Sequence, residues 1–176
     1  MVTQLSTPEK ATVSSVVAQI AHLLRGRGAL SIGDASMLRR MDPRKPAAAF
    51  FKVGGLVLDD LLPGDSAKRV ELETRWAAVI AGLAILGPLH EPSRRLGSVL
   101  AEAQFSELRF ARVIRGDADR LVEELPALAR FLAAKGAPVD WSWAAQLILS
   151  AGREDEEPVR RNVARDYFGA LARLGR

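Results

Sequence analysis

The sequence contains no cysteine and only two histidines, His22 and His90. Without cysteine the chain can form no disulfide bond, no thiolate metal site and no cysteine nucleophile. Two isolated histidines argue against a histidine-rich metal centre, so we predict neither a metal nor another cofactor. The lack of cysteine also fits a reducing compartment, and we expect the protein in the cytoplasm.

The sequence also lacks the short motifs of common enzyme sites. It has no GxxxxGK[ST] phosphate loop, no GxGxxG after a strand, no HExxH and no GxSxG. The paired carboxylates Asp59 and Asp60 fall at a predicted helix end, where they should be solvated. We therefore predict a protein without catalytic residues and without a small-molecule substrate.

No apolar segment has the length that a membrane span requires. Residues 1–10 are polar and lack the apolar core of a signal peptide. The longest uncharged stretch runs from Trp76 to Leu89 and is shorter than the roughly 20 residues that cross a bilayer. We interpret it as a buried core helix and predict a soluble protein without a membrane partner.

Alanine and leucine dominate the sequence, and glycine and proline stand between periodic blocks. This pattern predicts an all-α fold of about eight to nine helices. The first predicted helix is capped near Thr7-Pro8-Glu9 and ends at Gly26-Arg27-Gly28. The others cover about residues 32–40, 47–62, 66–86, 93–103, 106–115, 117–134, 141–151 and 156–174. The Gly54-Gly55 pair should kink the third helix or allow close packing.

The connection from Gly87-Pro88 to Glu91-Pro92 is the predicted boundary between two small helical bundles packed together. It divides the chain into an N-terminal lobe, residues 1–90, and a C-terminal bundle, residues 91–176. Trp76, Trp141 and Trp143 lie among alanines and leucines, where tryptophan is more often core than a platform for bases.

Arginine is the most distinctive feature of the composition, with 20 of the 25 basic residues and a net charge of +4. Its planar guanidinium binds phosphate through two parallel hydrogen bonds. This bias favours a polyanionic partner. The same bias also arises from a GC-rich genome, so composition leaves both explanations open.

A first basic cluster lies between residues 25 and 52. This segment contains seven basic residues and only two acidic ones, Asp34 and Asp42. Many of them fall at predicted helix ends and in loops, where side chains reach solvent and can follow a phosphate backbone. Cations at helix C-termini also stabilise the helix dipole, which accounts for some of them without a ligand. The predicted binding residues are Arg25, Arg27, Arg39, Arg40, Arg44, Lys45 and Lys52.

A second basic cluster combines Arg94 and Arg95 with Arg109, Arg112 and Arg115. The last three are spaced by three residues and so share one side of a predicted helix. They repel one another unless an anion or a carboxylate neutralises them. Either a nucleic acid or acids of another helix, such as Glu123 or Glu124, can do so, and the sequence does not distinguish the two.

The C-terminal segment joins the acidic run Glu154 to Glu157 with Arg160, Arg161 and Arg165. Acids in a first helical turn and arginines four residues later suit the helix dipole and i,i+4 pairing. We expect this run to stabilise its own helix and not to form a catalytic carboxylate cluster.

Taken in order and spacing, several segments resemble CasB, the small subunit of the type I-E CRISPR Cascade complex. The resemblance covers about residues 35–170. Its segments are Met37-Leu38-Arg39-Arg40, Trp76, Pro92, Arg95-Leu96-Gly97, Ser106-Glu107-Leu108-Arg109-Phe110-Ala111-Arg112, Lys135-Gly136, Val139-Asp140-Trp141, Val159-Arg160-Arg161 and Ala164-Arg165-Asp166-Tyr167-Phe168. One departure is Ala111-Arg112-Val113-Ile114, where the family pattern has a charged residue followed by paired leucines.

The resemblance implies a non-catalytic subunit that holds CRISPR RNA and target DNA by their backbones and stabilises the R-loop. It implies two copies beside the backbone and large subunits, and it carries a binding role to Arg39, Arg40, Arg109 and Arg112. The alternative is a helical protein-interaction or regulatory module without nucleic-acid binding, with its arginines paired to acids or buried at an interface.

Overall fold

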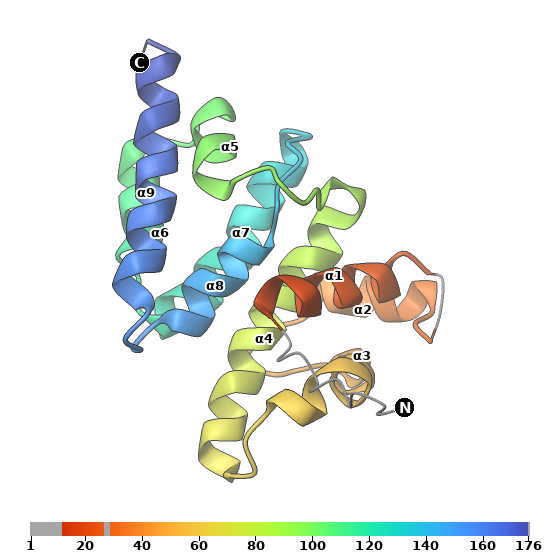
Figure 1. The fold of residues 1–176 in the computed structure, drawn as a ribbon. Helices are drawn as coiled ribbons and strands as arrows, with labels where there is room; N and C mark the ends of the chain where they lie inside the picture. Colours follow the sequence, from red (N-terminus) through yellow and green to blue (C-terminus); the bar gives the residue numbers. More distant parts are fainter. Residues whose placement is uncertain (1–11, 27–28, 176) are drawn as a thin grey trace, which may run out of the picture.

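The computed structural model describes residues 12–26 and 29–175, which form nine α-helices and no named strand. This confirms the predicted all-α fold. In chain order the helices are α1 Val13–Leu24, α2 Ile32–Arg40, α3 Ala48–Val53, α4 Ser66–Leu86, α5 Leu96–Glu102, α6 Glu107–Ile114, α7 Ala118–Ala134, α8 Ser142–Ser150 and α9 Glu156–Arg173 (Figure 1).

Polar residues at the helix starts fix several of these boundaries. A side-chain oxygen at the cap accepts a backbone N–H of the first turn, which otherwise has no partner. The caps of this kind are Thr12 for α1, Ser31 for α2, Asp65 for α4, Ser106 for α6 and Asp117 for α7. The cap predicted at Thr7-Pro8-Glu9 lies outside the described residues.

The predicted helix over residues 47–62 is divided at its two glycines. Regular α-helix ends at Val53, and Gly54–Leu58 forms a π-helical turn followed by a 3-10 turn over Asp59–Leu61. The kink expected at Gly54-Gly55 is therefore present, as a change of helix type. It directs the chain away from α3 toward the start of α4.

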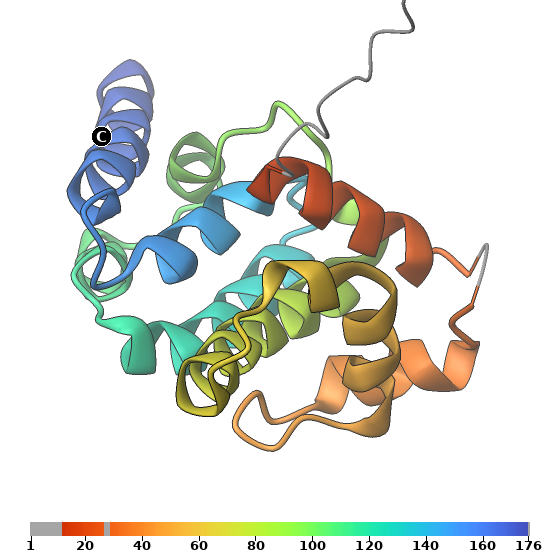
Figure 2. The same ribbon diagram turned by 60° about the horizontal axis from the view of Figure 1, so that its bottom comes forward.

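Helix α4 is the central element of the fold. Its second half is buried almost without interruption from Arg75 to Leu86, and α7 packs along it while α1, α2 and α8 cover its other sides (Figure 2). Among the described residues, Ser66–Leu89 is the one stretch long and apolar enough to cross a membrane, and 61% of its apolar window is buried inside the protein. That burial is what the core helix of a helical bundle shows.

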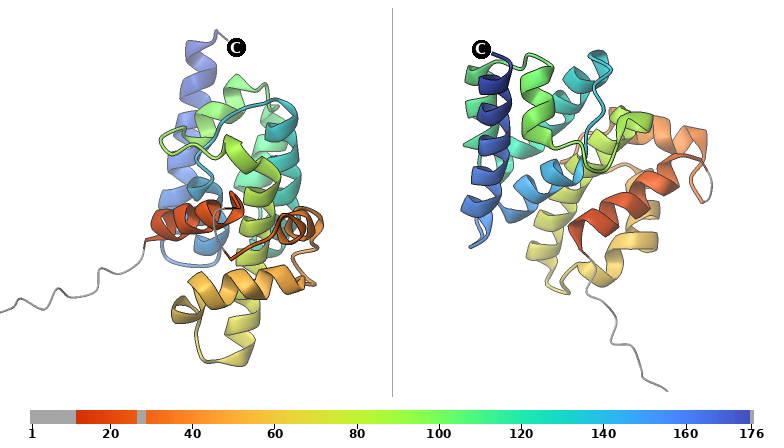
Figure 3. Two further views of the ribbon diagram at one scale, coloured as in Figure 1. Left: turned by 90° about the vertical axis from the view of Figure 1, so that its right-hand side faces the viewer. Right: turned by 45° about the horizontal axis from the view of Figure 1, so that its top comes forward.

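Helices α5, α6 and α9 form one end of the molecule (Figures 1 and 3). Helix α5 packs closely on α9 because Gly97 has no side chain: a Cβ there would lie 2.2 Å from the Val163 carbonyl oxygen. The rings of Phe110 and Tyr167 stack with centroids 3.9 Å apart. The Tyr167 hydroxyl also donates to the Phe105 carbonyl, 2.5 Å away.

One hydrophobic cluster of buried residues extends across the predicted boundary near residue 90. The Trp141 ring lies against Gly82 of α4, where a Cβ would be 2.3 Å from the ring, and its Nε1 donates to the Val79 carbonyl at 3.0 Å. Trp141 is fully buried and Trp76 is 6% exposed, as predicted for core residues. The segments 1–90 and 91–176 thus share a core, and their division into two lobes stays a prediction.

Candidate nucleic-acid interface

The basic residues singled out in the sequence differ in whether a carboxylate neutralises them. Arg27 lies outside the described residues. Those with a carboxylate oxygen within 4 Å are Arg44, Lys52, Arg94, Arg95 and Arg112. Among the described residues no such partner is found for Arg25, Arg39, Arg40, Lys45, Arg109 and Arg115. Charge clustering alone therefore does not identify an accessible cation here.

One group of cations lies where α6 faces α7. The Arg109 guanidinium lies over two aromatic rings, 4.6 Å from the Phe105 centroid and 5.2 Å from the Phe131 centroid. The Lys135 ammonium is 5.9 Å from the same Phe131 ring. Cation–π contacts hold a cation in position without cancelling its charge, so both remain available to an anion.

Two turns before Phe131, the same face of α7 carries a glutamate that is paired with two arginines. Glu124 accepts from Arg112 of α6 at 3.2 Å and from Arg120 at 3.0 Å. Residues 120, 124, 131 and 135 follow the i,i+4 and i,i+7 spacing of one helical face. Together Arg109, Arg112, Arg120 and Lys135 form what we call the α6–α7 stripe, about 22 Å long along α7, with Glu124 as its paired carboxylate.

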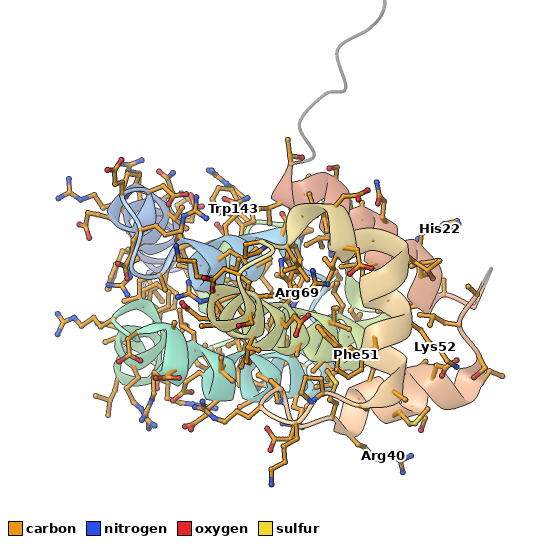
Figure 4. The ribbon with its side chains drawn as sticks, turned by 90° about the horizontal axis from the view of Figure 1, so that it is seen from below. His22, Arg40, Phe51, Lys52, Arg69 and Trp143 are labelled. Atoms are coloured by element: carbon orange, nitrogen blue, oxygen red, sulfur yellow. The ribbon has the colours of Figure 1, made fainter. Side chains whose placement is uncertain are left out.

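Three cations of the first cluster, Arg39, Arg40 and Lys45, lie at the end of α2 or in the loop that follows it. The Arg39 Nε donates to the Ala84 carbonyl at 2.9 Å, in the last turn of α4, and Arg40 donates to the Ser36 hydroxyl at 3.1 Å. Lys45 is exposed in the α2–α3 loop. Figure 4 shows Arg40 at the outer edge of the molecule. Arg39 thus stabilises the C-terminus of a neighbouring helix, while Arg40 and Lys45 face solvent.

Arg44, in the same loop, is neutralised more than once. Its guanidinium lies 3.2 Å from Asp119 and 3.2 Å from Glu123, both on α7, and it also donates to the Asp119 carbonyl at 3.2 Å. Hydrogen bonds to these two carboxylates raise the pKa of Arg44 above its usual value. Its charge is therefore offset within the chain.

Lys52 ties α3 to α2 (Figure 4). Its ammonium lies 2.7 Å from Asp34, a buried carboxylate that also accepts from the Ser31 backbone at 2.9 Å in a capping box. The hydrogen bonds from Lys52 and Ser31 lower the pKa of Asp34 to about 2. Lys52 thus has a structural partner that the sequence pattern did not reveal.

Arg94 and Arg95 also have local partners. Arg94 lies 2.9 Å from Glu102, and Arg95 lies 3.0 Å from Asp166 of α9. The Arg95 guanidinium additionally lies 4.9 Å from the ring of Trp143. Of the three tryptophans, Trp143 is thus the one that is partly exposed, and an arginine of the chain covers its ring.

Two cations of the predicted clusters remain, Arg25 after α1 and Arg115 at the C-terminal cap of α6. Arg25 follows α1 and is near enough to the buried His90 to lower its pKa, a smaller effect than the burial of the ring. Arg115 lines a cavity of about 420 Å³ together with Asp117, Asp119 and Glu156. Those acids offset its field, so Arg115 is a weaker candidate for phosphate than Arg109.

Sequence reasoning missed Arg120 and Lys135, which the spacing 120, 124, 131 and 135 places beside Arg112 and Arg109. It also missed Arg75, which is 8% exposed and donates to the carbonyls of Ile148 and Ala151 at 3.1 and 2.8 Å. No pattern in the sequence distinguishes this buried arginine from an exposed one. The expected pairing in the C-terminal run is present as Glu156 with Arg160 and Glu157 with Arg161.

No group of three or more histidine, aspartate or glutamate side chains is placed to hold a metal ion within the described part of the chain. A family model described as CRISPR-associated protein Cse2 matches residues 34–168. Searches of curated proteins and of solved structures gave no match. The matched range begins at α2 and ends in α9, so it includes the α6–α7 stripe and the α2 end.

Proposed function

Because the chain belongs to the Cse2 (CasB) family, the small subunits of the type I-E Cascade complex, we propose that it binds nucleic acid there without cutting it. It holds CRISPR RNA and target DNA through their sugar-phosphate backbones and stabilises the R-loop. It acts in the cytoplasm, beside the backbone and large subunits and a second copy of itself.

The observation that carries this proposal is the α6–α7 stripe. Four cations are gathered along about 22 Å of surface, with Glu124 as the carboxylate paired to two of them. Arg109 and Lys135 lie on aromatic rings and keep their full charge. A phosphate strand laid along this surface would supply the missing negative charge.

The energetics of R-loop formation suit weak contacts of this kind. Replacing a DNA duplex by an RNA–DNA heteroduplex is nearly balanced in free energy. A few backbone contacts can therefore decide whether the displaced and target strands stay apart. Such contacts carry no base information, so they serve any guide sequence.

The proposed contact residues follow the local charge balance. Arg109, Arg112, Arg120 and Lys135 make the main surface, and Arg39, Arg40 and Lys45 make a second one at the end of α2. Arg44, Lys52, Arg94 and Arg95 belong to ion-pair groups without a net positive charge, whereas Arg112 and Arg120 share one carboxylate and leave a charge of +1. Arg25 lies near the buried His90 and Arg115 lines a cavity with three acids, so we assign all six of these residues smaller contributions. Arg27 stays a prediction from the sequence.

A salt titration of the isolated chain tests the proposal. We expect weak, sequence-tolerant binding to single-stranded DNA of random sequence, with log K falling linearly with log salt concentration. Arg109→Ala should weaken binding and reduce the magnitude of this slope by about 0.7, the contribution of one phosphate on a single strand. Fluorescence anisotropy at several salt concentrations measures both quantities.

The matched control is Arg161→Ala, which removes an exposed arginine of α9 that pairs with Glu157. Its binding and its slope should stay close to those of the native chain. Absence of any salt-dependent binding by the native chain would remove the proposal for the isolated protein. An equal effect of both substitutions would remove the assignment of the α6–α7 stripe.

Exposed apolar side chains favour a second candidate, a protein-interaction role. Phe51 and Leu56 are 57% and 53% exposed, and Leu56 lines a cavity of about 490 Å³ with His22 and Leu23. Such patches suit contacts with other proteins. If the native chain fails to bind nucleic acid but still joins the complex, this role replaces the one proposed above.

A further inference from the structure

Three carboxylates in the N-terminal half of α7 bind three arginines in two separate groups. The two groups have net charges of opposite sign. Asp119 and Glu123 both lie 3.2 Å from the single guanidinium of Arg44. Glu124 alone is shared by Arg112 and Arg120, at 3.2 and 3.0 Å. The first group has a net charge of −1 and the second a net charge of +1.

These two groups face different neighbours because Glu123 and Glu124 are adjacent in the helix. Successive residues point about 100° apart around an α-helix. The Glu124 side of α7 faces Arg112 of α6, and the Glu123 side faces Arg44 in the α2–α3 loop. One turn of α7 thus presents a surplus of positive charge on one flank and a surplus of negative charge on the other.

We infer that the α7 carboxylates determine where a nucleic-acid strand lies on this protein, and that they exclude it from Arg44. This inference rests on the proposed function and refines it. A phosphodiester at the Glu124 group meets a net positive charge, because two arginines share one carboxylate. A phosphodiester at Arg44 meets a net negative charge and must first displace two carboxylates.

The ion pairs of Arg44 are exposed to solvent, so burial does not prevent a phosphate from replacing a carboxylate there. The side chains of Arg44, Asp119 and Glu123 are 43%, 86% and 65% exposed, so the surrounding solvent weakens each pair. The charge balance, and not burial, therefore keeps a strand away from Arg44. On the other flank the positive surface continues from the Glu124 group to Arg109 and Lys135.

Negatively charged side chains near a helix N-terminus interact favourably with the positive end of the helix dipole. The same carboxylates can therefore also stabilise α7. A purely structural role changes thermal stability and leaves nucleic-acid binding unaltered. A role in placing the strand changes which arginines contribute to the salt slope. The test therefore measures binding to random-sequence single-stranded DNA between roughly 50 and 200 mM salt, alongside the melting temperature.

The central comparison is Arg44→Ala in two backgrounds. In the native chain we expect it to leave the salt slope unchanged, because Arg44 contacts no phosphate. In the Asp119→Asn, Glu123→Gln background Arg44 is freed, and we expect its removal to reduce the magnitude of the slope by about 0.7. This difference between backgrounds is the coupling that a double-mutant cycle isolates.

Glu124→Gln is the complementary variant, and Glu157→Gln is its control. Both replace one glutamate that is paired with arginine by its uncharged isostere, but Glu157 pairs with Arg161 on α9. We expect Glu124→Gln to tighten binding several-fold by freeing Arg112 and Arg120. Glu157→Gln should change binding much less.

The outcomes separate this inference from the proposed function. No salt-dependent binding by the native chain overturns the proposed function itself. Native binding with equal effects of Arg44→Ala in both backgrounds overturns the inference and leaves the function standing. Equal tightening by Glu124→Gln and Glu157→Gln also overturns it, because net charge would then explain both.

Discussion

Arg75 and Arg109 have the same side chain in opposite surroundings. Arg75 is buried, donates to two carbonyls at the end of α8 and lies 2.5 Å from Glu71. Arg109 is exposed, and its guanidinium rests on Phe105 and Phe131. The first satisfies carbonyl groups that a helix C-terminus leaves without partners. The second keeps its charge available to a ligand.

His90 is the buried titratable residue between the two predicted lobes. It is 6% exposed, and its Nδ1 accepts the Trp141 backbone N–H at 3.2 Å. Burial lowers the pKa of His90 below its unfolded value of 6.5, against the opposing charge of Asp140 and with a smaller lowering from Arg25. The folded protein therefore favours the neutral ring.

This environment predicts that stability falls in mild acid. The contribution of neutral His90 is fully present above the unfolded pKa and is lost as pH falls through the lower folded pKa. The melting temperature should therefore drop between about pH 7 and pH 5. His90→Asn, which keeps an acceptor near the Trp141 N–H, should reduce this drop, whereas the exposed His22→Asn should not. An unchanged drop in His90→Asn contradicts the assignment.

At the scale of helices, the predicted ranges 32–40 and 66–86 coincide with α2 and α4. The side chains of Ser31 and Asp65 cap the first turns of these helices, and α4 ends at Gly87. The start of α5 was predicted at Ser93, but the helix begins at Leu96 because Ser93 adopts a positive φ of 79° in the preceding turn. Such a backbone state is set by the contacts around it.

The candidate site was harder to predict than the helices. The spacing of Arg109 and Arg112 predicted that they lie near each other, and Glu124 was one of two acids named as possible partners. The pairing of Arg44 with Asp119 joins residues 75 positions apart, and no local pattern indicates it. Which cations remain unneutralised therefore depends on tertiary packing, and the sequence shows only where cations are numerous.

The contact between α5 and α9 depends on a single glycine. A Cβ on Gly97 would lie 2.2 Å from the Val163 carbonyl oxygen and 2.7 Å from the Tyr167 nitrogen, both backbone atoms. Gly97→Ala must therefore separate the two helices, and we expect a loss of about 1–3 kcal/mol in the free energy of unfolding. Urea denaturation followed by circular dichroism measures it.

Gly169 in α9 is the control for this substitution. An added Cβ there would meet only the end of the flexible Arg173 side chain, at 3.5 Å. Gly169→Ala should be neutral or stabilising by up to about 1 kcal/mol, because alanine favours the helix. If Gly97→Ala is equally neutral, α5 and α9 do not pack as closely as described.

At the scale of the whole molecule, the central helix α4 joins the N-terminal helices to α7 and α8, while α5, α6 and α9 lie at one end. The net charge of +4 is distributed unevenly over this body. Positive charge is in excess along the α6–α7 stripe and at the end of α2, and it is offset around Arg44 and Arg115. We therefore predict that a bound strand would follow the surfaces with excess positive charge.

The lifetime of the R-loop in the assembled complex tests the central claim most directly. We expect Arg109→Ala combined with Arg112→Ala to shorten that lifetime, with assembly intact, for every guide sequence tried. Arg153→Ala combined with Arg161→Ala, which removes two exposed arginines with carboxylate partners outside the stripe, should leave it unchanged. An R-loop as long-lived with the first pair of substitutions as with the native subunit would contradict the binding role of the α6–α7 stripe.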